Sequence, residues 1–260
     1  MARQRSHFGA QGKERSRAPP ASEPSCEKRE RATTDVVAGR PKCLLSWSSG
    51  KDSAWALHVL RTEGRVDVVG LLTAVTAPFE RVSMHGVRRE LLAAQARAAG
   101  LPLVEIELPS PCPNAEYERL MGAAVARARA EGVEQIAFGD LFLADIRRYR
   151  EERLAGSGVE PIFPLWERPT SVLAREMMAA GVRAWLTSVD PRQVPADLAG
   201  RSWDADLLAR LPPTADPCGE NGEFHTFVCA GPMLSAPLPV APGPIVERDG
   251  FFFADLTLAS

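Results

Sequence analysis

The sequence predicts an α/β protein in which a parallel sheet carries helices on both faces and a smaller α+β domain follows. Two observations predict the sheet. Short apolar segments alternate with Ala- and Leu-rich segments of helical spacing between residues 43 and 139, and glycine ends several of the helical segments. This alternation is typical of strands linked by crossover helices. The third observation is a change to Pro- and Gly-rich sequence after Pro212, which predicts a different kind of domain.

The first part of the chain holds four expected strands and three expected helices. The strands are short apolar runs, at residues 43–47, 66–73, 101–108 and 134–139. The helices have apolar residues at helical spacing, at residues 53–64, 86–100 and 115–132. Ligands of parallel sheets bind at the carboxyl ends of the strands. We therefore expect the chemistry in the loops after Trp47, Thr73, Leu108 and Gly139.

The later part of the chain is less regular. A charged helix is expected at 143–154, a second helix at 171–181 and a loop at 191–200. Further strands are expected at residues 161–165, 184–189, 224–229, 244–247 and 251–258. The predicted organisation is a disordered tail over 1–40, a sheet domain over 41–142 and a smaller domain over 143–260.

Composition excludes several classes of protein. The 260 residues include 31 Lys and Arg against 33 Asp and Glu and are 45% hydrophobic, which is ordinary for a globular protein. No apolar run approaches the ~20 residues of a membrane span, so no membrane partner is expected. The near-neutral charge argues against a nucleic-acid partner. The five cysteines form no C-x-x-C pair, which favours reduced thiols and a cytoplasmic location.

Residues 1–40 differ from the rest of the chain. They hold nine Lys and Arg, five Asp and Glu, three prolines and no Leu or Ile. Such a segment buries too little apolar surface to offset the entropy of ordering, so we expect disorder. A mitochondrial presequence and a start codon assigned too early are the alternatives.

The first candidate site is the loop Ser48-Ser49-Gly50-Lys51-Asp52-Ser53, called here the 48–53 loop. It lies between an expected strand and an expected helix, where free backbone N–H groups and the helix dipole suit phosphate. Lys51 is one of two lysines after Arg40. Asp52 repels phosphate unless it binds magnesium or orients the loop. The loop is no Walker A motif, which needs glycine at Leu45 and Ser or Thr at Asp52. A polar turn with a serine helix cap is the alternative.

These residues resemble a known family. The 48–53 loop is similar to the pyrophosphate-binding S-G-G-x-D-S loop of N-type ATP pyrophosphatases, the PP-loop superfamily, with Ser49 in place of the first glycine. Residues 218–226, C-G-E-N-G-E-F-H-T, resemble the signature of the diphthine–ammonia ligase family and are called here the 218–226 segment. Four shorter segments similar to the family lie between them in the family's order, at residues 84–87, 138–140, 145–151 and 163–166. The resemblance covers roughly residues 42 to 235.

The resemblance implies a fold, an activity and partners. The fold is a nucleotide-binding α/β/α sandwich of the adenine nucleotide alpha hydrolase type, with a smaller carboxyl-terminal domain. The activity uses ATP and magnesium to adenylate a carboxylate, and ammonia then displaces AMP to give an amide. The acid is diphthine on a translation elongation factor. A homodimer is compatible with the sequence, which does not determine the oligomeric state.

Two other functions stay open. The first is an adenine nucleotide hydrolase or an enzyme with another acceptor, such as sulfur transfer through Cys112. The second is a protein of the same fold that binds ATP without turnover.

Site residues follow from this chemistry. The catalytic candidates are polar side chains of the two motifs: Lys51, Asp52, Glu220, Glu223 and His225. The residues Ser48, Ser49, Gly50, Lys51, Asp52 and Ser53 are expected to bind pyrophosphate, with Asp52 as a magnesium ligand. The expected contacts to the acid substrate are His85, Gly139, Asp140, Arg147, Arg150 and Asn221. The alternatives are a solvated Gly-rich turn at 218–226 and a solvated face of the charged helix.

Overall fold

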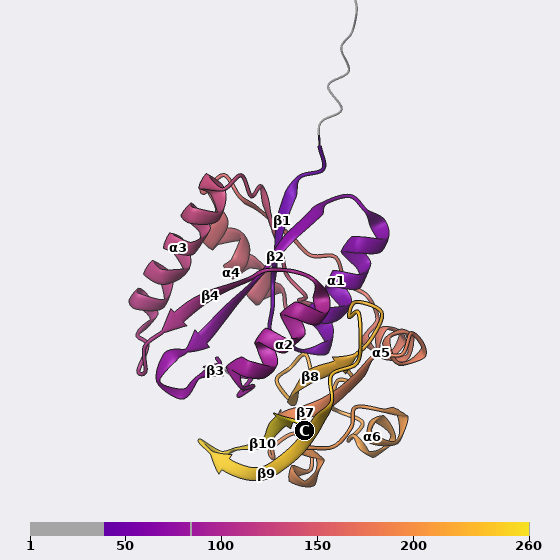
Figure 1. Cartoon of the computed structure of the whole chain (residues 1–260). Helices are drawn as coiled ribbons and strands as arrows, with labels where there is room; N and C mark the ends of the chain where they lie inside the picture. Colours follow the sequence, from indigo (N-terminus) through magenta and orange to yellow (C-terminus); the bar gives the residue numbers. More distant parts are fainter. Residues whose placement is uncertain (1–38, 84, 260) are drawn as a thin grey trace, which may run out of the picture. The chain divides into compact units, whose positions relative to one another are not determined.

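The computed structural model describes residues 39–83 and 85–259, and these residues belong to one compact unit (Figure 1). The expectations for residues 1–40 therefore lie almost wholly outside the described residues. In the part of the chain that is described, no helix is both long enough and apolar enough to cross a membrane.

The first sheet contains the strands predicted in the first part of the chain. Five parallel strands lie in the order β4-β2-β1-β5-β6, and the two-residue β3 runs antiparallel beside the end of β2. Their bounds are β1 Lys42–Ser46, β2 Asp67–Thr76, β3 Arg81–Val82, β4 Leu103–Leu108, β5 Gln135–Ala137 and β6 Glu160–Ile162. The predicted α/β class is confirmed.

Helices cover both faces of this sheet (Figure 1). Side chains alternate along the strands, so Leu45 joins one apolar cluster and Leu44 joins the other. The first cluster contains Leu57 of α1 and Leu91 of α2, whereas the second contains Val125 of α3. The helices are α1 Lys51–Glu63, α2 Arg89–Ala99, α3 Asn114–Ala130, α4 Ala144–Leu154, α5 Thr170–Ala179 and α6 Ala205–Arg210.

A second sheet follows the first and is antiparallel throughout. Its strands lie in the order β8-β7-β10-β9. They are β7 Arg183–Val189, β8 Phe224–Ala230, β9 Val240–Arg248 and β10 Phe251–Leu258. Together with α5 and α6 they give the predicted α+β region. The division at residue 142 stays a prediction, and α4 and β6, which follow that residue, pack with the first sheet.

A few elements differ from the sequence expectations in their bounds or were not expected at all. The strand expected at 161–165 ends at Ile162, where a turn begins in which Trp166 N donates to Phe163 O at 3.2 Å. The strand expected at 244–247 is the centre of the longer β9. The helix α6 was not predicted; its N-cap Asp204 accepts from Leu207 N at 2.9 Å.

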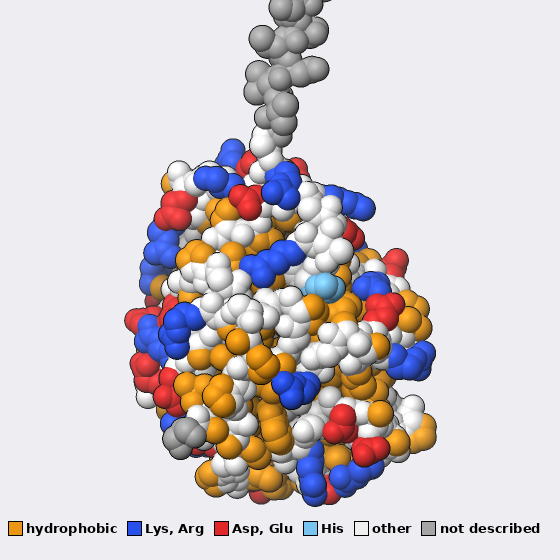
Figure 2. All heavy atoms as spheres, turned by 45° about the vertical axis from the view of Figure 1, so that its right-hand side comes forward, with side chains coloured by type: hydrophobic (Ala, Val, Ile, Leu, Met, Phe, Trp, Pro, Cys, Tyr) orange, Lys and Arg blue, Asp and Glu red, His pale blue; other side chains and the backbone are white. Residues whose placement is uncertain are grey.

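The strand order places a crevice at one edge of the first sheet. The chain proceeds from β1 to β2 on one side of β1 and later returns to pair β5 on the other side. Parallel sheets bind ligands at such a switch point, outside the carboxyl ends of the strands. The loops after β1 and β5 meet there, and β8 approaches the same place, because Val228 N donates to Ser49 O at 3.0 Å. On the face shown in Figure 2, side chains of both charges are intermingled.

Candidate functional site

A cavity of about 220 Å³ lies at the carboxyl ends of β1 and β5, between the 48–53 loop and the 218–226 segment. Most of the residues predicted for the site line it. Those residues are Ser48, Gly50, Lys51, Asp52, Ser53, His85, Gly139, Asp140, Arg150, Glu220 and His225. The two motifs therefore face one another across one cavity, although about 170 residues separate them along the chain.

A larger cavity of about 880 Å³ adjoins the first and shares Ser46, Ser48, His85, Phe138 and Arg150 with it. Its inner wall comes from strand ends and is apolar at Leu72, Ala74 and Ile106. The combined site thus has a polar end at the two motifs and an apolar end beside β2 and β4.

The 48–53 loop has the backbone shape that glycine favours. Ser49, which departs from the loop it resembles, has φ 71°. The left-handed region costs a non-glycine residue about 1–2 kcal/mol. Inside the loop, the hydroxyls of Ser48 and Ser53 lie 3.1 Å apart, and Gly50 N donates to Ser48 Oγ at 3.3 Å. The serine in place of glycine therefore still takes the left-handed conformation, and the loop leads directly into the N-terminus of α1.

Close packing explains two glycines of the site. A Cβ atom on Gly139 would lie 3.0 Å from Asp52 C and 3.0 Å from Ser53 N. A Cβ atom on Gly50 would lie 3.2 Å from Thr226 O. A side chain at either position would require the neighbouring backbone to shift by a few tenths of an ångström, so glycine suits the close approach of the loop after β5 and of β8 to the start of α1.

Lys51 connects the two motifs. Its side chain is 2% exposed, and Nζ lies 2.8 Å from Asp52 Oδ2 and donates to the carbonyl oxygen of Cys218. The ammonium also lies over the rings of Phe224 and Trp203, at 5.5 and 5.7 Å from the ring centroids. Burial alone would lower the pKa of Lys51, but attraction to Asp52 and its other neighbours raises it above 10.5. Lys51 therefore stays charged and holds the 218–226 segment against the loop.

Asp52 keeps one oxygen free. Its Oδ2 binds Lys51, whereas its Oδ1 is buried without a hydrogen-bond partner. Burial raises the pKa of the Asp52 carboxyl, and Lys51 opposes that shift. A carboxylate oxygen is the ligand that Mg²⁺ prefers, and this ion is often held by one or two carboxylates together with substrate phosphates. The Asp52 side chain fits that role. Among residues 39–83 and 85–259 no group of three or more His, Cys, Asp and Glu side chains forms a metal site.

The two glutamates of the 218–226 segment have different surroundings. Glu220 lines the cavity, and its Oε1 accepts from Leu141 N at 2.7 Å. Burial raises the pKa of Glu220 to about 7, against the lowering effect of that hydrogen bond. Glu223 is 1% exposed and does not line the cavity; its Oε1 accepts from Asp216 N at 2.7 Å and from Asn221 Nδ2 at 3.0 Å. Glu223 and Asn221 thus shape the segment in this structure, and their predicted contacts with reactants stay predictions.

Two histidines meet at the cavity. The ring centroids of His85 and His225 are 4.3 Å apart, and both side chains line the site. Burial lowers the pKa of His225 to about 4 and lowers that of His85 well below 6.5. Both imidazoles are therefore neutral at pH 7 and can donate or accept a hydrogen bond. His85 Nδ1 is buried without a partner.

The two predicted arginines lie in different places. Arg150 pairs with Asp140 at 2.5 and 3.1 Å, stacks on Phe138, and lines the cavity. Arg147 binds Glu151 at 2.8 Å and stacks on the rings of Phe163 and Trp166, outside both cavities. The structure therefore brings Arg150, but not Arg147, to the site. Cys112, the candidate for sulfur transfer, lines neither cavity.

Three residues of the site were not predicted. Thr226 Oγ1 accepts from Lys51 N at 3.1 Å, Leu141 N donates to Glu220, and Gln95 contacts the 48–53 loop. Thr226 lies within the 218–226 segment, so its hydroxyl was visible in the motif. Leu141 acts through its backbone, and Gln95 is one of several polar residues of α2, so nothing in their sequence context marked them.

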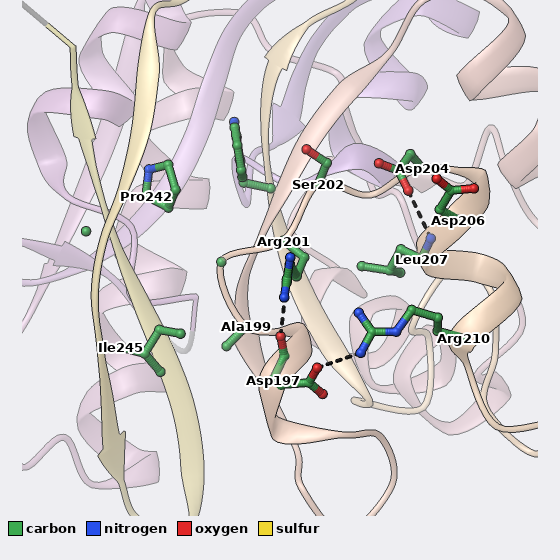
Figure 3. A pocket seen from close by; sticks show the side chains of 13 residues that line it. Asp197, Ala199, Arg201, Ser202, Asp204, Asp206, Leu207, Arg210, Pro242 and Ile245 are labelled. Carbon is green, nitrogen blue, oxygen red and sulfur yellow. Dashed lines mark hydrogen bonds and ion pairs between the residues drawn. The ribbon is translucent and has the colours of Figure 1, made fainter.

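Another cavity of about 790 Å³ lies between β9 and residues 197–210 and holds none of the predicted site residues (Figure 3). Pro242 and Ile245 stand on its β9 side, and charged side chains stand on the other (Figure 3). Asp197 and Arg210 pair there at 2.5 Å. The cavity is thus separate from the site formed by the two motifs.

Comparison with known proteins supports the family resemblance in the part of the chain that contains the 48–53 loop. The family described as the diphthamide synthase N-terminal domain matches residues 41–160. A diphthine–ammonia ligase from Homo sapiens is 28% identical to the chain over 149 residues, which are 55% of this chain and 55% of that protein. The corresponding ligase from Rattus norvegicus is 26% identical over 149 residues, with the same coverage. The chain thus matches about half the length of these curated relatives. Residues 41–160 are thus similar to the diphthamide synthase N-terminal domain, and the resemblance of the chain to the diphthine–ammonia ligase family is confirmed.

Proposed function

We propose that this protein is an ATP-dependent ligase that forms a C–N bond, in the manner of the diphthine–ammonia ligases. One observation carries the proposal: the 48–53 loop and the 218–226 segment line the same cavity at the switch point of the parallel sheet. The names of the two relatives, both diphthine–ammonia ligases, support it. In the proposed reaction a carboxylate attacks the α-phosphorus of ATP, pyrophosphate leaves, and ammonia then displaces AMP from the acyl adenylate.

The 48–53 loop would hold the pyrophosphate half of ATP. Its backbone N–H groups stand at the N-terminus of α1, which attracts anions, and the hydroxyls of Ser48 and Ser53 line the cavity. Stabilising the departing pyrophosphate lowers the barrier to adenylation because negative charge builds up on the leaving group. Lys51 adds a positive charge behind the loop, although its ammonium is engaged by Asp52 and Cys218 O.

The unpartnered Oδ1 of Asp52 is the proposed magnesium ligand. Magnesium, when bound with ATP, would neutralise phosphate charge during the transfer. The apolar wall at Leu72 and Ala74 is the proposed position of the adenine ring, because it adjoins the 48–53 loop.

Glu220 is the proposed base for the second step. With a pKa of about 7, its carboxyl is partly ionised at neutral pH and can take a proton from ammonium or from attacking ammonia. The neutral imidazoles of His85 and His225 stand beside it in the cavity and can bind the acid or the acyl oxygen. Arg150 and Asp140 also line the cavity, where they form an ion pair with each other.

The test is to incubate the purified protein with ATP, magnesium, ammonium and candidate acids, including an elongation factor that carries diphthine. We expect AMP, pyrophosphate and amide in equal amounts. The Asp52→Asn variant should lose this turnover, whereas Asp67→Asn, at an exposed aspartate at the other end of the sheet, should keep it. ADP as the product would contradict the proposal, and tight ATP binding without AMP would indicate a binding protein.

Several finer points stay predictions. They are diphthine as the acid, the elongation factor that carries it, a homodimer and a cytoplasmic location. The assay with the elongation factor checks the first two, and light scattering of the purified chain checks the third.

A further inference from the structure

Gln95 is a polar residue in the buried face of α2. It is 0% exposed, and its neighbours on that face, including Leu91, Leu92 and Ala99, belong to the main apolar cluster. Burying a primary amide is unfavourable unless its hydrogen-bonding groups are satisfied. The partners of Gln95 therefore show what this residue does.

All three of its hydrogen bonds involve the start of the site. Gln95 Oε1 accepts from the indole nitrogen of Trp47 at 2.9 Å. Gln95 Nε2 donates to the carbonyl oxygens of Ser49, at 3.0 Å, and of Val228, at 2.6 Å. The orientation of the amide follows from these partners, because an indole N–H only donates and a carbonyl only accepts. No other orientation satisfies all three.

The Ser49 carbonyl receives a second donor from β8. Val228 N donates to Ser49 O at 3.0 Å, so this oxygen is held from two sides. The hydroxyl of Ser49 is itself buried without a partner, so no hydrogen bond from this hydroxyl offsets the unfavourable φ of 71°. The conformation of Ser49 is thus held from outside the loop, by α2 and β8, which lie beside the start of α1 (Figure 1).

We infer that Gln95 is a positioning residue that holds the 48–53 loop in its anion-binding shape and fastens β8 to it; the inference rests on the proposed function. Gln95 lines neither cavity, so it would act through Ser49 and not by touching ATP. Without its two donated bonds, a serine at this position would move toward the backbone conformations that L-residues prefer. The hydrogen bonds that Gly50 N donates to Ser48 Oγ and that Lys51 N donates to Thr226 Oγ1 would then be weakened, and the loop would lose its present shape at the cavity.

The test compares two Gln→Leu variants by titration with inorganic pyrophosphate and with AMP. Gln95→Leu removes the three bonds and keeps the side-chain volume. Gln135→Leu is the matched control, because Gln135 pairs with Cys43 at the other end of the sheet and its Oε1 has no partner. Gln95→Leu should weaken pyrophosphate binding about tenfold or more, which corresponds to about 1.4 kcal/mol, and change AMP binding less than about twofold. Gln135→Leu should change neither.

A rescue experiment separates positioning from packing. Glycine adopts a φ of 71° without strain, so adding Ser49→Gly to Gln95→Leu should restore most of the pyrophosphate affinity. Hydrogen exchange at the amides of Gly50 and Lys51 should rise in Gln95→Leu and fall again in the double variant. A loss of packing around α2 would not respond to Ser49→Gly.

If Gln95→Leu does not fold, Gln95→Met takes its place, since it keeps the length of the side chain without burying a charge and lacks the amide that donates to both carbonyls. Unchanged pyrophosphate binding in a folded Gln95 variant, or no rescue by Ser49→Gly, would overturn the inference and leave the proposed function intact. Wild-type protein that binds neither ATP nor pyrophosphate would overturn both.

Discussion

The two loops of the site differ in where their hydrogen-bond partners come from. The 48–53 loop is held by distant elements: Gln95 and Val228 bind the Ser49 carbonyl, and Thr226 binds Lys51 N. The 218–226 segment is shaped largely by side chains next to it. Asp216 Oδ1 accepts from Cys218 N at 2.8 Å, and Glu223 Oε1 accepts from Asp216 N at 2.7 Å.

This difference shows which loop is sensitive to remote changes. A loop held by its own side chains keeps its shape when neighbouring elements change, because its donors and acceptors move with it. A loop held from outside changes shape when any supporting element is altered. We therefore expect substitutions far along the chain to disturb the 48–53 loop more than they disturb the 218–226 segment. Lys51, which touches both, is the place where one change should affect the two together.

The largest expected effect follows from Lys51→Met. Removing the ammonium leaves the Asp52 carboxylate and the Cys218 carbonyl without their partner in a buried site. Removing one member of a buried ion pair typically lowers the free energy of unfolding by about 3–5 kcal/mol. Urea unfolding should show this loss, together with loss of ATP turnover. Lys42→Met, at an exposed lysine, should do neither, and a stable Lys51→Met would show that the two loops are held independently.

The next effect separates the two glutamates. Glu223→Ala removes the acceptor for Asp216 N and Asn221 Nδ2, which should lower the free energy of unfolding by about 1–3 kcal/mol. Glu220→Gln keeps an acceptor for Leu141 N, so its stability should stay near that of the wild type while its turnover falls about 100-fold. Equal stability losses in the two variants would contradict the division between a shaping and a reacting carboxylate.

The pH dependence tests Glu220 through the difference between the wild type and Glu220→Gln. Its pKa of about 7 predicts that turnover falls about tenfold per pH unit below pH 7, because only the ionised carboxylate accepts a proton. The folded state also binds more protons than the unfolded state between pH 4.5 and 7, so the contribution of this group to stability decreases as the pH rises through that window. Rate profiles and urea unfolding from pH 5 to 8 measure both, and Glu220→Gln should lack both slopes.

The smallest expected effect is a gain in stability from Ser49→Gly. Relief of the left-handed conformation is worth about 1–2 kcal/mol, and the added freedom of glycine in the unfolded chain removes about 0.5–1 kcal/mol of that gain. The free energy of unfolding should therefore rise by about 0.5–1 kcal/mol. Ser235→Gly, at an exposed serine without a positive φ, should bring no gain. A loss of stability in Ser49→Gly would show that the buried hydroxyl contributes more than the backbone.

Much of the first sheet could be predicted because its signals are local. The alternation of apolar runs with helical spacing predicted β1, α1, β2, α2, β4, α3 and β5 with bounds close to those observed. Alternation also predicted that the loops after β1, β2, β4 and β5 carry the chemistry, since parallel strands end at the same edge of a sheet. The two-residue β3 and the six-residue α6 are too short for a repeating pattern of apolar residues to be recognised in their sequence.

The sequence by itself determined the alternation of elements and the positions of both motifs, because these depend on residues close together in the chain. Only the tertiary structure decided the conformation of Ser49, the direction of the Lys51 ammonium and the role of Gln95. The bonds responsible join residues 133, 167 and 175 positions apart. A local pattern reports backbone periodicity, whereas the partner of a buried donor or acceptor is set by which segments the fold brings together.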